Sequence, residues 1–451
     1  MKTLCAALCL LALMATGISR AQTQGGNEIL PDVGAILGDQ KPTAASGPML
    51  TLDEIEQIAL AENPEIHVAV RRVAMAEAHV PTTGTLDDPQ LMYRGWQVPL
   101  SKPWDYNAAQ NMLMVGRSLT GPGKRSLQTS IARSDVEEMK DELESTRLRV
   151  RIEVRKAFYD LLLTQDELRI HDQHVVIAHQ AIEAARIKYT VGKVPQQDIL
   201  KAQLAMTRLA EHMIRFERDA DVARAQMNTL LGRDPSTSIN IQGDFGVGAV
   251  LPSDKELETL SLQSRPDLLA AQVAVEKSQE EQALTKKAFV PDFSVAAGYM
   301  LMPTGSDFRN NYMAEGSMSL PWLNRRKHNA EVAESTAKVS EQDAEVMASR
   351  AAAFGQIEEA LVEAHAAQRL VRVYSDTLRP QAEATLHAAV IAYENNQTDL
   401  LDLLDSQMTV IDIDLSTFQA MGDFAARRSE LELAVGAPVE SVQLGVPEAK
   451  Q

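Results

Sequence analysis

The stretch Asn63-Pro64-Glu65-Ile66 returns as Arg265-Pro266-Asp267-Leu268, 202 residues further along the chain. Further landmarks keep nearly the same register: Asp88-Pro89 returns as Val290-Pro291, Lys124-Arg125 as Arg325-Arg326, Tyr189 as Tyr393, Asp198 as Asp402, Gln203 as Gln407 and Gly232 as Gly436. Landmarks that hold register over such a span predict one structural unit present twice. The unit is far longer than a solenoid repeat, so we expect a protomer with an internal two-fold repeat.

Residues 1–21 have the pattern of a secretory signal peptide. A lysine near the start is followed by a short apolar stretch at 4–14, and small residues lead up to a cleavage site after Ala21. The apolar stretch is too short to span a membrane. Cys5 and Cys9 are the two cysteines of the sequence, so the predicted mature chain can form neither a disulfide nor a thiolate metal site.

The rest of the chain is acidic and rich in helix-forming residues. The formal net charge of −18 becomes −20 without Lys2 and Arg20, which argues against nucleic acid as a partner. Nothing after the predicted signal peptide reaches 18 consecutive apolar residues, so we expect no transmembrane helix. Aromatic residues make up only 4% of the chain, which favours long helices in thin coiled-coil layers over a thick globular core.

Each predicted repeat contains the same elements in the same order. The first repeat, 50–232, is expected to hold a proline-interrupted helix, a β-hairpin at 89–120, a long helix at 124–191 and a returning helix at 195–231. The second, 254–436, is expected to hold an equivalent first helix, a hairpin at 291–320, a long helix at 327–395 and a returning helix at 398–435. An extended leader at 22–49, a linker at 233–253 and a tail at 437–451 complete the expected organisation.

The long helix of the first repeat is the clearest of these elements. Residues 126–191 contain neither glycine nor proline over 66 positions, which predicts a rod of roughly 100 Å. Such a helix cannot pack inside a globule of this size. In the second repeat, Gly355, Pro380 and Gly422 are expected to interrupt or kink the helices.

The hairpins decide whether the chain contacts a membrane. Odd positions from Phe293 to Leu301 are apolar, whereas the even positions include Ser294 and Gly298. This alternation over about ten residues is typical of an outer-membrane strand, although a soluble hairpin packed on helices would show it too. Four strands cannot close a barrel, and unpaired edges are not tolerated in lipid. Three copies would supply twelve strands.

This order of elements resembles that of the TolC-like outer-membrane efflux factors, over about residues 50–436. The resemblance is carried by the prolines at 64, 89, 266 and 291 and by the paired helical turns after Tyr189 and Tyr393. The segment Gly121-Pro122-Gly123-Lys124-Arg125 looks like the heavy-metal and cation branch of that family.

The resemblance implies a mainly α fold with a small β part. A long α-helical coiled-coil barrel would continue into a trimeric, twelve-stranded outer-membrane β-barrel, to which each protomer gives four strands. It also implies passive conduction without enzymatic chemistry or a cofactor. The implied partners are two further copies of the chain, outer-membrane lipid, a periplasmic adaptor and an inner-membrane pump of the RND type.

The resemblance further implies functional residues at the periplasmic ends of the helices. Asp402 and Asp405 fit the family pattern of an acidic ring, with Asn396 in place of its glycine; in the first repeat Lys201 takes the second position and only Asp198 remains. They could equally be solvated surface acids. The implied adaptor-docking residues are Tyr189, Gly192, Val194, Ile199, Leu200, Tyr393, Asn396, Thr398, Leu403 and Leu404. Alternatively, the leucines only pack the helices together.

Other motifs give only weak indications of catalysis or of metal binding. Ser335 and Lys338 have the spacing of penicillin-binding enzymes without the partner motifs, and Gly123-Lys124-Arg125 lacks the Ser/Thr of a phosphate loop. His171, His174 and Glu167 could lie on one helix face, but the chain lacks the Glu-x-x-His spacing of di-iron bundles, and we interpret the histidines as surface residues. The hairpin methionines are Met92, Met112, Met114, Met300, Met302, Met313 and Met318. We interpret them as apolar filler, although thioethers also suit Cu(I).

The sequence does not determine the substrate. The Lys124-Arg125 region favours metal cations over drugs, and a duct for type I protein secretion is an alternative. A soluble periplasmic coiled-coil scaffold is the alternative outside this class, but it would not need paired ten-residue strands at matched positions.

Overall fold

The computed structural model describes residues 49–439 of the chain, except 99, 102, 303–309 and 396, and these lie within one structural unit, residues 44–451. In chain order the elements are β1 (Met49–Leu50), α2 (Leu52–Glu62), α3 (Pro64–Gly84), β2 (Gln90–Trp96), η1 (Tyr106–Ala108), β3 (Gln110–Leu119), α4 (Lys124–Thr190), α5 (Gln196–Leu230), β4 (Asn240–Ile241), α6 (Asp254–Ser264), α7 (Pro266–Lys286), η2 (Lys287–Phe289), β5 (Phe293–Leu301), β6 (Asn310–Met318), η3 (Pro321–Asn324), α8 (Arg325–Val373), η4 (Tyr374–Leu378), α9 (Arg379–Glu394) and α10 (Leu400–Val435).

Each repeat opens with a short capped helix and a proline-initiated helix. At the start of α2, Thr51 and Glu54 form a capping box in which the Thr51 amide donates to the Glu54 carboxylate at 2.8 Å. Ser253 and Glu256 form the same box at the start of α6. Helices α3 and α7 both begin at a proline, whose missing N–H leaves no donor unpaired there. The two repeats therefore start by the same local chemistry.

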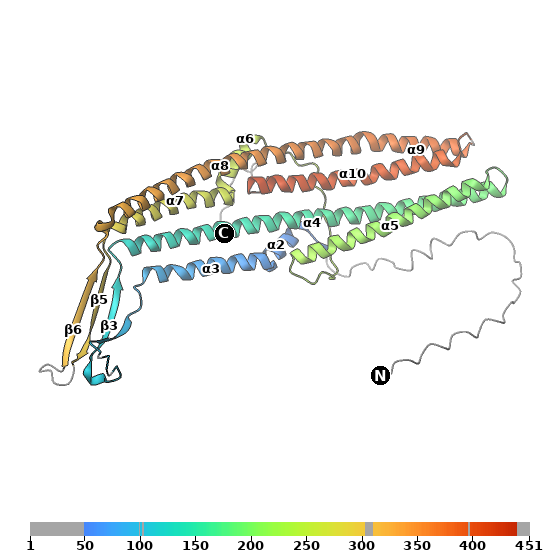
Figure 1. Cartoon of the computed structure of the whole chain (residues 1–451). Coiled ribbons are helices and arrows are strands. Elements are labelled where there is room, and N and C mark those ends of the chain that lie inside the picture. The colour runs from blue at the N-terminus through green and yellow to red at the C-terminus, as the bar shows by residue number, and fades with distance from the viewer. Residues whose placement is uncertain (1–48, 99, 102, 303–309, 396, 440–451) are drawn as a thin grey trace, which may run out of the picture. The chain divides into compact units, whose positions relative to one another are not determined.

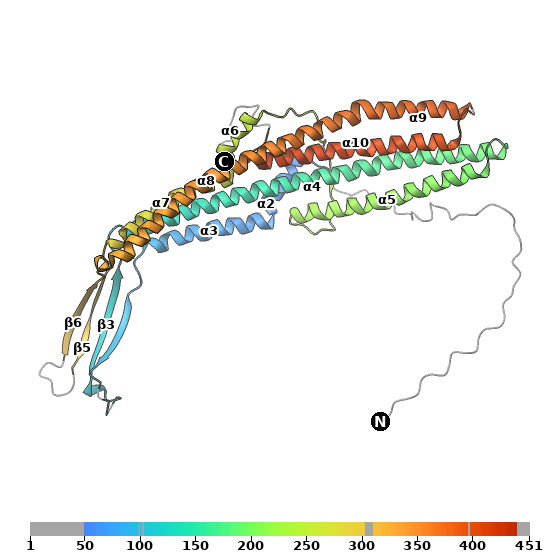
Figure 2. The same cartoon turned by 45° about the horizontal axis from the view of Figure 1, so that its top comes forward.

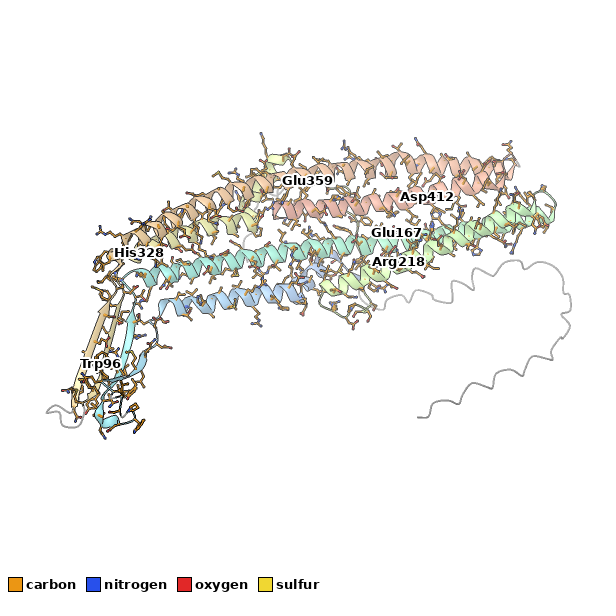
Figure 3. All side chains as sticks on the ribbon, viewed as in Figure 1. Trp96, Glu167, Arg218, His328, Glu359 and Asp412 are labelled. Carbon is orange, nitrogen blue, oxygen red and sulfur yellow. The ribbon has the colours of Figure 1, made fainter. Side chains whose placement is uncertain are left out.

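Helix α4 organises the helical part of the chain. It has 67 residues and packs against α3 and α5 of its own repeat and against α7 and α10 of the other (Figure 1; Figure 2). Glu167 is labelled on this helix, about midway along the helical part in the view of Figure 3. Because one uninterrupted helix contacts both repeats, the two repeats share a single layered bundle.

The corresponding helix of the second repeat is divided. A π-helical segment, Tyr374–Leu378, separates α8 from α9 just before Pro380. A proline ring clashes with the carbonyl four residues earlier in an α-helix, here that of Asp376, and the wider turn relieves this clash. Helices α8 and α10 continue through Gly355 and Gly422, because a glycine keeps its N–H and costs only about 1 kcal/mol. The predicted interruption is found at Pro380 and not at the glycines.

The core consists of apolar clusters along the bundle. One lies where α2, α4 and α5 meet the segment after β4, and it includes Ile55, Phe158, Met227 and Phe245. Another joins α6, α8 and α10 through Leu257, Ile357 and Leu431. These thin clusters, in place of one thick core, agree with the low aromatic content of the sequence.

A buried ionic network connects the two repeats. Arg155 of α4 forms ion pairs with Glu56 of α2 and with Glu432 of α10, and Arg428 Nε lies 3.7 Å from a Glu432 oxygen. The Glu432 side chain is only 3% exposed. Burial raises the pKa of its carboxyl group, and the positive charges of Arg155 and Arg428 only partly oppose that effect.

Four antiparallel strands form one sheet in the order β2-β3-β5-β6. The central strands β3 and β5 come from different repeats, and Leu113 pairs with Tyr299 between them. The sheet lies beyond the ends of α3, α4, α7 and α8, and Trp96 is labelled toward its far end (Figure 1; Figure 3). Strands β1 and β4 form a separate short parallel pair.

The junction between sheet and helices is fixed by Asp292. Its Oδ1 accepts a hydrogen bond from the Gly121 amide at 2.7 Å and from Lys124 Nζ at 2.8 Å. Burial alone would raise the pKa of Asp292, but these donors outweigh it and hold the pKa below its usual value. A Cβ on Gly121 would lie 2.6 Å from the Pro291 carbonyl oxygen, so only glycine fits this approach.

None of the helices that the structure describes contains an apolar segment long enough to cross a membrane. The predicted fold class is confirmed, because the chain is mainly helical, carries a small sheet and repeats one order of elements.

Candidate functional site

Two helix–helix turns lie side by side at the end of the bundle remote from the sheet (Figure 1; Figure 2). We call residues 188–204, around the turn between α4 and α5, the first tip. Residues 393–408, around the turn between α9 and α10, are the second tip. Side chains from both tips share one apolar cluster. All residues predicted for the acidic ring and for docking belong to these two tips.

A glycine shapes the first tip. Gly192 has a φ of +73°, and its amide donates to the Tyr189 carbonyl oxygen at 2.9 Å. The next amide, of Lys193, donates to the Lys188 carbonyl oxygen at 2.9 Å, which ends α4 in a left-handed cap. No atom lies within 4 Å of a Cβ built on Gly192. Glycine is therefore required here by the backbone conformation and not by lack of space.

An aspartate shapes the second tip. Asp399 caps α10, with its Oδ1 accepting from the Asp402 amide at 3.0 Å. Thr398 Oγ1 donates a hydrogen bond to the Asp402 carboxylate. The predicted ring residue Asp402 is thus held beside the turn by its neighbours. Asn396, predicted for both the ring pattern and docking, lies outside the described residues.

Several predicted docking residues lie inside the tips. Tyr393, Leu403 and Leu404 are 6%, 8% and 9% exposed and belong to the shared apolar cluster. Ile199 is half-buried and packs against that cluster, and Val194 is half-buried in the turn. Four of these side chains, Tyr393, Leu403, Leu404 and Ile199, pack the helices of the tips together, which is the role that the alternative interpretation gives to the leucines.

Other apolar residues of this end are exposed. Tyr189 and Leu200 are 41% and 43% exposed. Sequence reasoning missed Val191 and Leu204 of the first tip and Ile187 directly before it, which are more than half exposed. The sequence could have indicated these exposed residues, because the first tip has more apolar residues than one core-facing stripe of a helix can bury. Together they give it an apolar surface.

A lysine joins the two tips. Lys188 Nζ donates to the Tyr393 carbonyl oxygen at 2.7 Å and lies 3.4 Å from the centre of the Tyr393 ring. Burial and the neighbouring Lys193 lower the pKa of Lys188. Burial raises the pKa of Tyr393, and so does the negative charge of Asp198. Sequence reasoning missed this contact, because it depends on how α4 and α9 lie relative to each other.

The two tips carry opposite charge. The first tip contains Lys188, Lys193, Lys201 and Asp198, whereas the second contains Glu394, Asp399, Asp402 and Asp405 and neither lysine nor arginine. Asp402 and Asp405 are exposed and, three residues apart on α10, lie on the same face. Asp198 is half-buried. The acidic surface that could attract cations is therefore concentrated on the second tip.

His171, His174 and Glu167 are only 2%, 6% and 6% exposed, so the prediction that the histidines lie on the surface is wrong: they face α5 and α10 inside the bundle. His171 Nε2 lies 2.6 Å from the Leu209 carbonyl oxygen, His174 Nε2 lies 3.8 Å from Asp414, and Glu167 accepts a hydrogen bond from a glutamine of α10. Burial lowers the pKa of His171 and raises that of Glu167. Within the described ranges, no group of three or more His, Cys, Asp or Glu side chains is placed to hold a metal ion.

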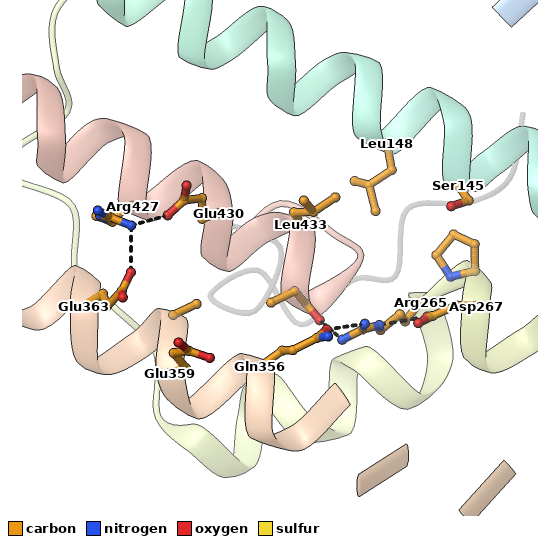
Figure 4. Close-up of a pocket in the computed structure, with 13 residues that line it drawn as sticks. Ser145, Leu148, Arg265, Asp267, Gln356, Glu359, Glu363, Arg427, Glu430 and Leu433 are labelled. Atoms are coloured by element: carbon orange, nitrogen blue, oxygen red, sulfur yellow. Dashed lines mark hydrogen bonds and ion pairs between the residues drawn. The ribbon is translucent and has the colours of Figure 1, made fainter. Parts of the chain in front are cut away.

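A surface pocket of about 560 Å³ is lined by residues of α4, α7, α8 and α10 (Figure 4). Arg427 Nη1 lies 2.8 Å from Glu363 and 2.9 Å from Glu430, and Arg265 Nε lies 2.8 Å from Asp267. Both arginines that line the pocket thus form ion pairs with acidic residues of the same chain. The pair of Arg427 with Glu363 connects α10 with α8, and we assign the pocket no ligand.

Comparison with known proteins identifies relatives along most of the chain. The family model described as outer membrane efflux protein matches residues 56–233 and 258–437. The cobalt-zinc-cadmium resistance protein CzcC of Cupriavidus metallidurans is 21% identical over 94% of this chain and 97% of that protein. The solved outer-membrane channel OprN has a TM-score of 0.71 at 18% identity and covers 86% of this chain and 90% of its own. For CusC the TM-score is 0.72 at 15% identity, with coverage of 86% and 92%.

Proposed function

The chain belongs to the outer membrane efflux protein family, and from this we propose that it is the outer-membrane channel of a tripartite efflux system. Members of this family are channels and not enzymes. The protein is an outer-membrane protein whose helices extend into the periplasm. Its mechanism is passive conduction, in which no bond is made or broken and the driving force comes from a partner pump.

The observation that carries this proposal is the apolar face of the sheet. Strand pairing places Tyr93, Leu113, Tyr299 and Tyr312 in one row across all four strands. All four side chains are exposed, from 38% for Tyr299 to 93% for Tyr312. A continuous apolar surface of this kind is unfavourable in water and suits contact with lipid.

The sheet edges support a homotrimer. Strands β2 and β6 each have one neighbour among the described strands, which leaves one edge of each without a partner within the chain. Such edges are not tolerated in lipid, and four strands are too few for a barrel. Pairing of β6 with β2 of the next copy would close a barrel of twelve strands from three copies, and the helices of the three copies would enclose the periplasmic tunnel.

The tips are the proposed contact with a periplasmic adaptor, which itself binds an inner-membrane pump of the RND type. The exposed apolar surface of the first tip is the best supported part of this contact. The proposed docking residues are Tyr189, Gly192, Val194, Ile199 and Leu200 of the first tip and Thr398 of the second. In this proposal Tyr393, Leu403 and Leu404 act from inside, by holding the shape that the adaptor meets.

Metal cations are the proposed substrates. Asp402 and Asp405, with Asp198, would form an acidic ring where three second tips meet, and crowded carboxylates attract cations. The sequence relative named for cobalt, zinc and cadmium resistance supports the same substrate class. Deletion of the gene should sensitise cells to these cations. Unchanged metal tolerance together with new sensitivity to hydrophobic drugs would overturn this assignment.

Fractionation tests the channel itself. The expressed chain should appear in the outer-membrane fraction as an oligomer that survives detergent electrophoresis unheated and dissociates to monomer on heating. A soluble monomer in the periplasm would refute the proposal.

Docking is tested by crosslinking. The predicted mature chain has no cysteine, so Val194→Cys and Thr398→Cys provide single reactive sites at the two tips. Both should form disulfides with cysteines on the cognate adaptor in assembled pumps, whereas Met347→Cys, exposed on α8, should not. Equal crosslinking at all three positions would contradict docking at the tips.

A further inference from the structure

Five methionines share one face of the four-stranded sheet, opposite the apolar row described above. They are Met92, Met112, Met114, Met300 and Met313. Met92 pairs with Met114 between β2 and β3, and Met112 pairs with Met300 between β3 and β5. Because side chains alternate along a strand, residues paired in this way point to the same side of the sheet. We call these five residues the methionine face.

Two glycines lie among these methionines. A Cβ built on Gly116 would lie 2.8 Å from Cε of Met92, whereas a Cβ built on Gly298 would lie 2.1 Å from the Leu113 carbonyl oxygen and 2.6 Å from Cα of Met114, so the backbone itself requires glycine there. Gly298 pairs with Met114 on one side and with Met313 on the other, so it lies between two methionines. The end of the Met92 side chain therefore lies over Gly116, a position without a side chain.

The methionine face is the more buried face of the sheet. Met114 and Met112 are 1% and 7% exposed, and the other three are half-buried, whereas the opposite row is exposed. Arg94 of β2 and Glu315 of β6 form an ion pair of 3.4 Å, and their register places them on this same side. In the proposed barrel the opposite row meets lipid, so the methionines would border the water-filled lumen.

That position is unusual for apolar filler. The interior of a conducting outer-membrane barrel is polar, so five methionines on its face need a reason beyond the packing of Met112 and Met114. Thioethers have a second property, since they are soft, uncharged ligands that suit soft monovalent ions such as Cu(I). A row of methionines along a lumen is thus better explained by contact with a soft cation.

The pairing geometry permits shared coordination. Directly opposed residues in antiparallel strands have Cβ atoms about 4.5–5.5 Å apart, and successive residues on one face are about 7 Å apart along the strand. Methionine side chains are long and flexible enough to bring sulfurs from two such pairs to one ion. The pairs Met92–Met114 and Met112–Met300 are adjacent on the sheet, and Met313 lies beyond Gly298.

We propose that the methionine face binds a soft monovalent cation, Cu(I) or Ag(I), during its passage through the barrel, with Met92 and Met114 as the central ligand pair. This inference rests on the proposed function, since it needs the face to line a conducting lumen. Thioethers are not protonated in the physiological range, so binding should be independent of pH between about 5 and 8. A site made of carboxylates and histidines would lose affinity over the same range.

Silver binding by the purified full-length oligomer in detergent tests the site. Equilibrium dialysis against silver nitrate in chloride-free buffer, followed by elemental analysis, should give about one ion per chain at pH 5 and at pH 8. The double change Met92→Leu with Met114→Leu should lower the silver affinity by about tenfold or more, because it removes two ligands. Leucine nearly conserves the volume of methionine, so the sheet should still form.

The matched control changes two methionines elsewhere. Met75→Leu with Met347→Leu alters residues that are 69% and 68% exposed on helices, and it should leave silver binding unchanged. No silver on the wild-type oligomer, or equal binding by the two double variants, would overturn the site. Fractionation separates this outcome from failure of the channel proposal. A heat-modifiable outer-membrane oligomer that binds no silver refutes only the methionine site, whereas a wild-type chain that forms no such oligomer refutes the channel.

Discussion

Asn63 Nδ2 donates a hydrogen bond to the Leu230 carbonyl oxygen at 2.9 Å and so ties the start of α3 to the end of α5. In the second repeat, Arg265 Nη1 donates to the Ala434 carbonyl oxygen at 2.8 Å and ties α7 to α10 in the same way. Different side chains thus make one equivalent contact, which explains why the residue before each proline differs although its position is repeated.

Asn63→Ala should destabilise the first repeat by about 2 kcal/mol. The change removes the N-cap of α3 and leaves the Leu230 carbonyl without this donor, each worth about 1 kcal/mol. The apparent melting temperature, followed by circular dichroism, should fall by a few degrees. Asn395→Ala is the control, because exposed Asn395 bonds only to Ile391 of its own helix. Equal shifts for the two variants would contradict the role of the tie.

Arg155→Met should cost about 3 to 5 kcal/mol of stability, because it leaves buried Glu432 and Glu56 without their main cation. Adding Glu432→Gln should recover part of the loss by removing the uncompensated charge. Arg147→Met breaks an exposed pair with Glu144 and should change stability by less than about 1 kcal/mol. Denaturant unfolding of all three variants checks this order. A double variant weaker than Arg155→Met alone would count against it.

Stability should fall on acidification through His171. Burial lowers the pKa of His171 in the folded chain below its ordinary value of 6.5, while Leu209 and Asp172 oppose the shift and His212 and His174 add to it. The unfolded chain therefore binds more protons in that window, and stability declines as the pH falls below about 6.5.

The matched variants are His171→Gln and His179→Gln. Histidine 179 is exposed, so its replacement should leave the pH dependence intact, whereas His171→Gln should flatten it. Melting temperatures between about pH 5 and 7.5 provide the measurement. The interpretation fails if the wild-type and His171→Gln curves keep the same slope.

Lys188→Met should let the tips separate more readily. It removes both the hydrogen bond to Tyr393 and the contact with its ring, together worth about 1 to 2 kcal/mol, or roughly a five- to thirtyfold change in the balance between joined and separated tips. Single-channel conductance in planar bilayers should rise or show longer open periods. Lys193→Met, which removes an exposed lysine of the same turn, should leave conductance near that of wild type.

Replacing Asp402 and Asp405 together by asparagine should weaken cation selectivity. The second tip would lose two of its four acidic residues per copy, and hence six charges from a ring of three copies. The reversal potential in a potassium chloride gradient should move toward zero. Asp343→Asn, an exposed acid of α8, is the control. An unchanged reversal potential would place these carboxylates outside the conduction path.

The fold class could be predicted from the sequence because each pattern that indicates it lies within a single helix or strand. The absence of glycine and proline specifies α4, and the alternation around Phe293–Leu301 specifies a strand. The repeated glycines have a local cause and a long-range one. Gly232 and Gly436 have φ values of +66° and +86°, and a Cβ on either would lie less than 3 Å from backbone atoms of the distant helix corner it packs against. The left-handed backbone and this close approach each require glycine there.

The tips could be predicted only in part, because exposure there is set by long-range packing. Leu403 and Leu200 are both apolar residues near a turn, yet the first is buried in the shared cluster and the second is exposed. The Lys188–Tyr393 contact and the methionine face each combine residues of both repeats. How the two repeats lie relative to each other cannot be predicted from the sequence of either repeat alone.

The unpartnered edges of β2 and β6 also bear on how the protein is made. The helices can fold in water from a single chain, because their backbone groups are satisfied internally. The sheet cannot enter lipid until other chains cover its edges. If copies of the chain close the barrel as proposed, closure and entry into the bilayer would be one event, and its rate would depend on the concentration of folded chains. Channel formation would therefore be limited by encounters among copies, with a steep dependence on expression level, while folding of each helical bundle would not depend on it.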